Sequence, residues 1–402
     1  MFKFLDTNAD VNLHPQMLPH PSHIAVPAKP RTRKSFRPWP YRRGLFVLLL
    51  PLSFLLTRLA AAHPHLTESI YSQRIYPVLA GIFGRVFGLV PFSVAEFLLY
   101  GLIVAAVAYL GVQIIRLITR GEKSHRFFKL LATIGCVAGV GYFLFTALCG
   151  LNYHRVTFAE QSGLVIRPSS VQELGLLYEE LIGRVNDLRA LVNENEDGVM
   201  VLDPHSMRDA ARLAPQGIER LAEQFPVFSG YVPPPKPVLA SRGMSRLNIT
   251  GVYVPFTFEA NVNVDIPHMG IPFTMLHELA HFSGFMREDE ANFIAYLAAR
   301  EMDDPAFRYS GVVFALIHTG NALFAADRAL YRELSAYIDE AVWRDFADNR
   351  AYWLQFEGRI AEVATVINDA YLRHNRQEDG VFSYGRMVDL LLADYRERHG
   401  LR

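Results

Sequence analysis

The sequence predicts a membrane anchor of three α-helices followed by a mainly α-helical, α+β domain with a small β-sheet. Long apolar runs fall between residues 44 and 151, in a chain of 402 residues with 51% hydrophobic residues and a mean hydropathy of +0.13. From residue 152 onward, helical patterns with one polar face dominate, and a single segment alternates with period two. We therefore divide the chain into a disordered tail over 1–43, a membrane region over 44–151 and a domain over 152–402.

Charge and cysteine content exclude several classes of protein. The formal net charge is +0 and the pI is about 7.3, so the overall charge gives no reason to expect nucleic acid as a partner. Both cysteines, Cys136 and Cys149, fall in the third apolar run. The domain that follows therefore has no thiol nucleophile and no zinc–thiolate site. The sequence also lacks phosphate-binding glycine motifs and nucleophile elbows.

Three apolar runs predict transmembrane helices, at about residues 44–62, 90–118 and 127–151. Lys and Arg cluster before the first run and between the second and third, at Arg31, Arg33, Lys34, Arg37, Arg42, Arg43, Arg116, Arg120, Lys123, Arg126 and Lys129. Cytoplasmic loops carry such an excess of positive charge. We therefore expect a cytoplasmic N-terminus, an outer loop over 63–89 whose apolar stretch at 82–89 could lie along the membrane surface, and an extracytoplasmic C-terminal domain.

The domain opens with two expected helices, over residues 171–193 and 209–225. The segment 252–266 alternates strictly between apolar and polar residues, and Pro255 marks either an edge position or a break between two strands. An exposed edge there could bind an extended peptide, or the sheet could be purely structural. Beyond residue 306 the chain is predicted helical to its end. The apolar part at 312–326 is too short and too polar for a fourth span.

A metal-binding motif stands at residues 277–281, with the sequence His-Glu-Leu-Ala-His. His277 and His281 project from one face of a helix, one turn apart, so both imidazoles can reach one metal ion. Glu278 is placed to hold and deprotonate a water molecule. Imidazole with carboxylate suits Zn²⁺, and catalytic zinc sites use three protein ligands and leave one position open.

The third ligand is expected from the acidic cluster at residues 288–292. The first helix has its apolar start at 272–276 and its stop at Ser283-Gly284, and a second helical pattern begins at the acidic cluster. A helix, a tight turn and a returning helix would bring a carboxylate back to the two His. Glu288, Asp289 and Glu290 are the candidates.

Two resemblances extend this interpretation. The His-Glu-Leu-Ala-His motif with the acidic cluster resembles the gluzincin metallopeptidases, in which the ligand Glu often precedes a supporting Asp or Asn by four residues. Glu288 and Asn292 have that spacing, which favours Glu288 over Glu290, although the connection from His281 is shorter than in most gluzincins. A longer set resembles an uncharacterised bacterial membrane-protein family known as domain of unknown function 3810. It comprises residues 151–155, 251–257, 259–263, 272–274, 288–293 and 379–385.

Together, motif and resemblance imply a zincin-like domain anchored in the bacterial inner (cytoplasmic) membrane by several spans. The expected function is zinc-dependent hydrolysis of a peptide or protein of the cell envelope, with Glu278 as general base. Tyr384 and His374 are candidate donors to the developing oxyanion. The alternative is a zinc-binding sensor, scaffold or pseudo-peptidase that binds peptides without cleaving them. An intramembrane protease is excluded, because the His pair lies over a hundred residues beyond the last predicted span.

Overall fold

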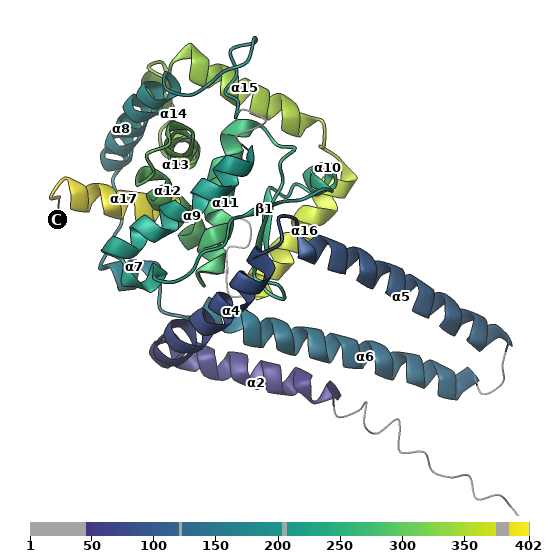
Figure 1. The fold of residues 1–402 in the computed structure, drawn as a ribbon. Helices are drawn as coiled ribbons and strands as arrows, with labels where there is room; N and C mark the ends of the chain where they lie inside the picture. Colours follow the sequence, from purple (N-terminus) through teal and green to yellow (C-terminus); the bar gives the residue numbers. More distant parts are fainter. Residues whose placement is uncertain (1–45, 120–122, 203–206, 375–385, 402) are drawn as a thin grey trace, which may run out of the picture. The chain divides into compact units, whose positions relative to one another are not determined.

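The computed structural model describes residues 46–119, 123–202, 207–374 and 386–401, whose helices and strands are drawn in Figure 1. The predicted tail over 1–43 lies outside these residues. The described part is mainly helical with one three-stranded sheet, so the predicted mixture of many helices and a small sheet is confirmed.

Two of the predicted spans are long apolar helices. α5 covers Val94–Thr119 and α6 covers Lys123–Leu148, with 26 residues each. At about 1.5 Å per residue, either helix exceeds the roughly 30 Å of a bilayer's hydrocarbon core. Of their apolar windows, only 0% and 11% are buried inside the protein. Most of their surface is therefore free to face lipid, which supports membrane association.

The third helix of sufficient length and hydropathy is not the one that the sequence predicted. The run at 44–62 contains α2, Leu49–Ala62, whose 14 residues are fewer than the roughly 20 of a typical span, and α2 packs along α6. Instead, α13, Pro305–Ala326, meets both criteria, and 56% of its apolar window is buried inside the protein. It packs against α8 (Val171–Arg189) and α12 (Glu288–Arg300). Its apolar composition thus reflects a place in the core.

Residues 64–88, predicted as an outer loop, are helical. They form α3 (Pro64–Leu66), the π-helix η1 (Thr67–Ile75) and α4 (Tyr76–Gly88). The Tyr76 hydroxyl donates to the carbonyl oxygens of His281 and Phe282, at 3.2 and 3.1 Å. A Cβ at Gly84 would lie 2.9 Å from the Phe282 ring, so close packing requires glycine there. Glycine lowers helix propensity, and tertiary contacts outweigh that propensity here.

The strands follow the alternating segment, with a break at Pro255. β2 (Gly251–Val254) pairs antiparallel with β3 (Glu259–Val262), and the two-residue β1 (Lys236–Pro237) pairs parallel with β3 on its other side. The sequence left open whether Pro255 marks an edge or a break; it ends β2. An exposed face on both strands was predicted, and for β3 this is wrong. All four β3 residues are buried, because β3 is central and α11 packs on it.

Two buried carboxylates join α5 to this sheet. Glu259 of β3 accepts hydrogen bonds from the backbone N–H groups of Val94 and Ala95, at 3.0 and 2.7 Å, and pairs with Lys236 of β1. Glu96 in the first turn of α5 accepts from the backbone N–H groups of residues 239 and 240. A carboxylate at a helix N-terminus interacts favourably with the helix dipole. The sheet is therefore tied to a membrane-spanning candidate at its start.

The remaining helices pack around α11–α12. Their bounds are α7 Phe158–Ser162, α9 Met207–Gln224, α10 Ser241–Arg246, α14 Arg328–Ser335, α15 Glu340–Leu354, α16 Arg359–His374 and α17 Met387–Arg398, with the short η2 Gly150–His154, η3 Pro226–Phe228 and η4 His268–Gly270. α8 begins with a capping box between Ser170 and Glu173. Helices are thereby confirmed at the two predicted positions 171–193, where α8 ends four residues earlier, and 209–225, and beyond 306 in the residues that the structure describes.

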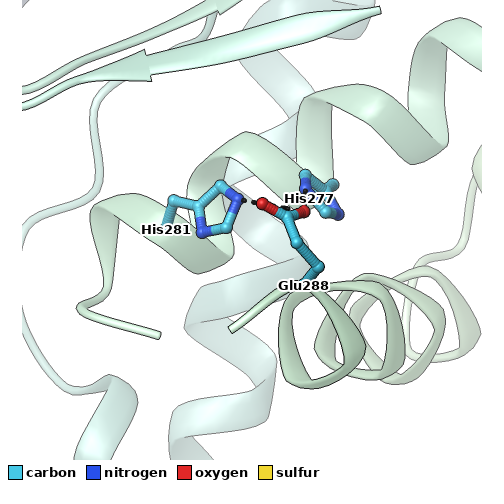
Figure 2. Close-up of side chains that lie close together, drawn as sticks. All are labelled: His277, His281 and Glu288. Atoms are coloured by element: carbon cyan, nitrogen blue, oxygen red, sulfur yellow. Dashed lines mark ion pairs between the residues drawn. The ribbon is translucent and has the colours of Figure 1, made fainter. Parts of the chain in front are cut away.

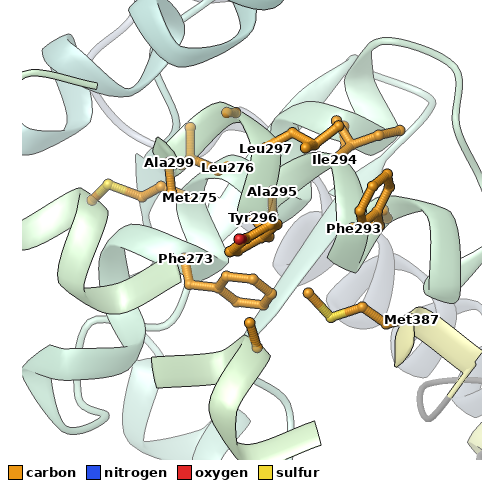
Figure 3. Close-up of a cluster of buried hydrophobic side chains, with 14 of the residues drawn as sticks. Phe273, Met275, Leu276, Phe293, Ile294, Ala295, Tyr296, Leu297, Ala299 and Met387 are labelled. Atoms are coloured by element: carbon orange, nitrogen blue, oxygen red, sulfur yellow. The ribbon is translucent and has the colours of Figure 1, made fainter. Parts of the chain in front are cut away.

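The centre of the core lies where α11, α12 and α17 meet. Figure 3 shows Phe273 and Leu276 of α11 beside Tyr296 of α12 and Met387 of α17. All four are at most 3% exposed. Burying one such side chain contributes about 1.5–3 kcal/mol. This packing holds α11 and α12 in a fixed relation, which positions the residues of the candidate site.

Candidate metal centre

Three ligand-type side chains converge between α11 (Ile271–Phe282) and the start of α12. Figure 2 shows His277 and His281 on adjacent turns of α11, with the Glu288 carboxylate between their rings. Glu288 Oε2 lies 3.2 Å from His277 Nε2 and 3.7 Å from His281 Nε2. One ligand atom from each residue lies within 4.8 Å of the other two. The arrangement matches the two imidazoles and one carboxylate that a divalent cation such as Zn²⁺ accepts.

The turn from α11 to α12 brings the carboxylate to the two imidazoles. α11 ends at Phe282, and Gly284 follows with φ +91°, a conformation that residues other than glycine rarely adopt. A Cβ there would also lie 3.1–3.2 Å from side chains of Asn152, Tyr76 and Arg155. Glu288 is the first residue of α12, where the positive end of the helix dipole favours an ionised carboxylate.

A buried arginine holds this turn in place. Arg155 donates to the carbonyl oxygen of Gly284 at 3.2 Å, and its guanidinium lies 4.1 Å from the centre of the Phe285 ring. Its other nitrogens donate to both carboxylate oxygens of Glu68 on η1, at 2.9 and 2.7 Å. Planar bidentate pairs of this kind are strong and geometrically specific. Arg155 therefore fixes the connection that sets the position of Glu288.

The second ring nitrogen of His281 is arranged as in protein-bound metal sites. His281 Nδ1 lies 2.7 Å from the carbonyl oxygen of Phe285. A carbonyl can only accept, so Nδ1 carries the hydrogen and Nε2 is left to face Glu288. Metal-ligating histidines show this backbone or carboxylate partner, which fixes the tautomer. His277 Nδ1 is buried without a hydrogen-bond partner among the described residues.

The electrostatics of the cluster favour a cation between the three side chains. Burial lowers the pKa of His281, but attraction to Glu288 outweighs burial and raises that pKa to about 9. Burial also opposes ionisation of Glu288, yet the two imidazoles hold the pKa of this carboxyl well below its usual range. A divalent cation would displace the proton on His281, because imidazole binds metal only in its neutral form.

Glu278 lies next to the cluster and is held by the edge strand of the sheet. The backbone N–H of Tyr253 on β2 donates to its carboxylate, and burial raises the pKa of Glu278 to about 7 against the attraction of the two imidazoles. Its Oε2 atom is buried without a partner among the described residues. A Cβ at Gly251 would lie 2.8 Å from Glu278 Cγ. β2 therefore packs against α11 at this position. The backbone N–H of Tyr253, at the edge of the sheet, is already bonded to Glu278.

The other acidic candidates lie outside the cluster. Glu290 Oε1 accepts from the backbone N–H of Phe158 at 2.9 Å and pairs with Arg287 at 2.8 Å. Asp289 lies 3.8 Å from Arg386, and burial raises the pKa of Asp289 to about 6. Asn292 is buried one turn after Glu288. Of the three carboxylates that the sequence left open, the structure brings only Glu288 to the two imidazoles.

Of the two predicted oxyanion donors, the structure describes only His374. Tyr384 lies outside the described residues. His374 is on α16, and its Nε2 lies 3.3 Å from the Tyr142 hydroxyl of α6. The prediction for Tyr384 therefore stays a prediction, whereas His374 contacts α6, a candidate membrane span.

Three side chains near the cluster were not predicted. The hydroxyls of Tyr153 and Tyr371 lie 2.8 Å apart; burial raises the pKa of the Tyr153 phenol, and the charge of Glu288 raises it further. His318 on α13 interacts electrostatically with His277. His318 lies one turn after Phe314 on α13. The Phe314 ring stacks on the ring of Phe273, with centroids 4.1 Å apart, and Phe273 lies one turn before His277 on α11. Only Tyr153 had a sequence signal, because it stands in the family-like stretch at 151–155.

Fold and site together define a mainly helical protein with apolar helices long enough to cross a membrane and a buried His–His–Glu cluster beside a small sheet. The model of a family described as protein of unknown function (DUF3810) matches residues 71–392. The chain belongs to this family, as its resemblance in sequence predicted. No curated protein and no solved structure matches the chain.

Proposed function

We propose that the protein is a zinc-dependent metallopeptidase anchored in a membrane. The observation that carries the proposal is the convergence of His277, His281 and Glu288, with ligand atoms within 4.8 Å of one another, beside Glu278. A structural zinc site has no use for a second, adjacent carboxylate with an oxygen that has no partner among the described residues. A hydrolytic site does, because a general base must lie close to the attacking water.

The three ligand residues fit zinc by chemistry as well as by position. Two imidazoles and a carboxylate with an open fourth position form the ligand set of many zinc hydrolases. When bound, zinc would supply Lewis acidity toward the carbonyl group and would make water more acidic. The carbonyl oxygen of Phe285 orients His281 for this role.

The chain's own residues would carry the proton transfer and the binding of the carbonyl oxygen. Glu278, whose pKa is raised to about 7, takes a proton from water through its free Oε2 and passes it to the leaving amine. Tyr153 and Tyr371 beside Glu288, and His318 beside His277, are the described groups that can donate a hydrogen bond to the carbonyl oxygen. Tyr384 remains a fourth candidate.

The proposed location is the bacterial inner membrane, with the N-terminus in the cytoplasm and the metal centre outside it; this orientation requires the run at 44–62 to cross the bilayer together with α5 and α6. The lipid bilayer and a peptide or protein of the cell envelope are then its partners. Charge placement around the predicted spans supports this orientation. A reporter that is active only outside the cytoplasm should be active after Arg402 and inactive in the loop at 121–124. The opposite pattern would move the metal centre into the cytoplasm.

The decisive experiment combines metal content with a change that spares the ligands. Purified full-length protein should contain about one zinc per chain, which His277→Ala and His281→Ala should lose. His374→Ala is the matched control and should keep zinc. Glu278→Gln should also keep zinc but abolish cleavage.

Because the substrate is unknown, the cleavage readout must be unbiased. Envelope proteins and peptides are compared between cells that carry the wild type and cells that carry Glu278→Gln. Proteins that stay uncut only in the variant are the substrates. Identical fragments in both cells, together with a different phenotype in His277→Ala cells, would replace the peptidase by a zinc-binding sensor or scaffold.

A further inference from the structure

α16 (Arg359–His374) exposes a continuous apolar stripe. Ile360, Val363, Ile367 and Tyr371 recur at spacings of three, four and four residues, which places them on one face of the helix. Their exposed fractions are 63, 58, 65 and 42%. Leu372, which lies outside this stripe, is fully buried. A stripe of large apolar side chains that faces outward requires a partner.

The C-terminal end of this stripe contacts a membrane-spanning candidate. The ring of Tyr371 lies edge-on to Phe145 of α6, with centroids 6.3 Å apart, and His374 Nε2 lies 3.3 Å from the Tyr142 hydroxyl. α6 ends at Leu148, so these contacts lie about 4.5 and 9 Å inside its end at 1.5 Å per residue. Helices that lie in a membrane interface bury their apolar face about 5–10 Å deep. Contacts with the last two turns of a membrane-spanning candidate therefore place this end of α16 near the edge of a bilayer.

We propose that α16 is an interfacial helix whose apolar stripe lies in the bilayer, at the boundary between headgroups and acyl chains. The face of α16 that touches α6 also carries Ile367 and Val363, nearer the start of the helix. Beside the end of a membrane-spanning helix, the surroundings of this face are lipid. The opposite face is polar and carries the ion pair of Asp369 with Arg373 at 2.7 Å. One apolar face and one charged face are what the interface requires.

This placement brings the metal centre next to the bilayer. Tyr371 shares a hydrogen bond with Tyr153, and both phenols interact electrostatically with Glu288. The helix in the interface therefore forms part of the wall around the cluster, and lipid contact holds Tyr371 in position. The proposal for α16 does not depend on bound zinc or on peptidase activity, and it can fail without affecting either.

Quenching by brominated lipids tests the placement. Full-length protein is reconstituted into phosphatidylcholine nanodiscs whose acyl chains carry bromine either near the headgroup or near the bilayer centre. The fluorescence added by Ile367→Trp is the signal of the variant minus that of the wild type. Relative to unbrominated lipid, it should fall by about half or more with bromine near the headgroup. The loss should be smaller with bromine near the centre. Val363→Trp, one turn earlier, should behave in the same way.

The control is an exposed apolar residue on a helix of the core. Leu176 of α8 is 48% exposed, and α8 packs against α13, α14, α15 and α17. The fluorescence of Leu176→Trp should be the same in unbrominated lipid and in both brominated lipids. If Ile367→Trp and Val363→Trp are equally unaffected, the stripe is not in the bilayer. A second copy covering the stripe would give that same unquenched result, and it too would overturn the proposal.

Discussion

Gly251→Ala is the most direct test of how β2 positions Glu278. The added methyl group would lie 2.8 Å from both Glu278 Cγ and Thr274 Cγ2, closer than carbon atoms approach without displacement. The φ angle of Gly251 is not in the left-handed region, so alanine is tolerated by the backbone itself. The substitution therefore acts on the side chain of Glu278 and leaves the three ligand residues untouched.

The expected magnitude follows from this contact. Forcing an extra methyl group into a packed interior costs about 1–3 kcal/mol of unfolding free energy. Relief of the contact requires Glu278 to move by about 1 Å, and a misplacement of that size in an active site lowers the rate on the order of 100-fold. Zinc content should remain that of the wild type, because the contact does not involve His277, His281 or Glu288.

The assay compares unfolding, zinc content and envelope cleavage for Gly251→Ala and for the control Gly243→Ala. In Gly243 the added Cβ would meet only Ala240 Cβ, at 3.9 Å, so this variant should match the wild type in all three measurements.

A double-mutant cycle identifies the cause of the loss in stability. Gly251→Ala should cost less in a Glu278→Ala background, by about 1 kcal/mol, because the clashing carboxyl arm is gone. An equal cost in both backgrounds would refute the contact. Wild-type cleavage by Gly251→Ala would refute the role of a fixed Glu278.

Three further predictions concern the ligands, the proton balance and the turn. Glu288→Gln should lose zinc and Glu290→Gln should keep it in metal analysis; the reverse result would make Glu290 the ligand. Calorimetric zinc titration of metal-free protein near pH 7 should release about one proton per ion, because the pKa of His281 is raised to about 9; the release should vanish above pH 9, and affinity should fall with acidity. Arg155→Met should lower the unfolding free energy by about 3–5 kcal/mol, since Glu68 stays buried without its partner. Adding Glu68→Gln should restore most of that loss, and an unchanged loss would contradict the pairing.

Local patterns in the sequence determined the elements that depend on neighbouring residues. The bounds of α11 follow from its apolar start and from the Ser283-Gly284 stop, and the spacing of His277 and His281 follows from 3.6 residues per turn. The long apolar helices α5 and α6 were predicted within a few residues. The break between β2 and β3 was signalled by Pro255. In each of these cases the determining interactions are hydrogen bonds and side-chain periodicity within one segment.

Contacts between distant segments decided the rest. Glu288 and Glu290 are two residues apart, and the sequence favoured Glu288 only through a spacing that resembles the gluzincins. Glu290 accepts a hydrogen bond from Phe158, 132 positions earlier in the chain. Arg155, 129 positions before Gly284, holds the turn that directs Glu288 toward the two His. No periodicity in one segment encodes such pairings, because they depend on where the chain folds back.

The same reason explains why apolar composition alone does not separate a membrane span from a core helix. The run at 44–62 and the run within α13 look alike in hydropathy, yet α13 is enclosed by α8 and α12 and belongs to the core. Water is excluded from a protein core as it is from a bilayer, so both environments select the same side chains. The sequence determined that these segments avoid water. Only the tertiary structure decided which of them the protein itself covers, and which side chains it brought beside Glu288.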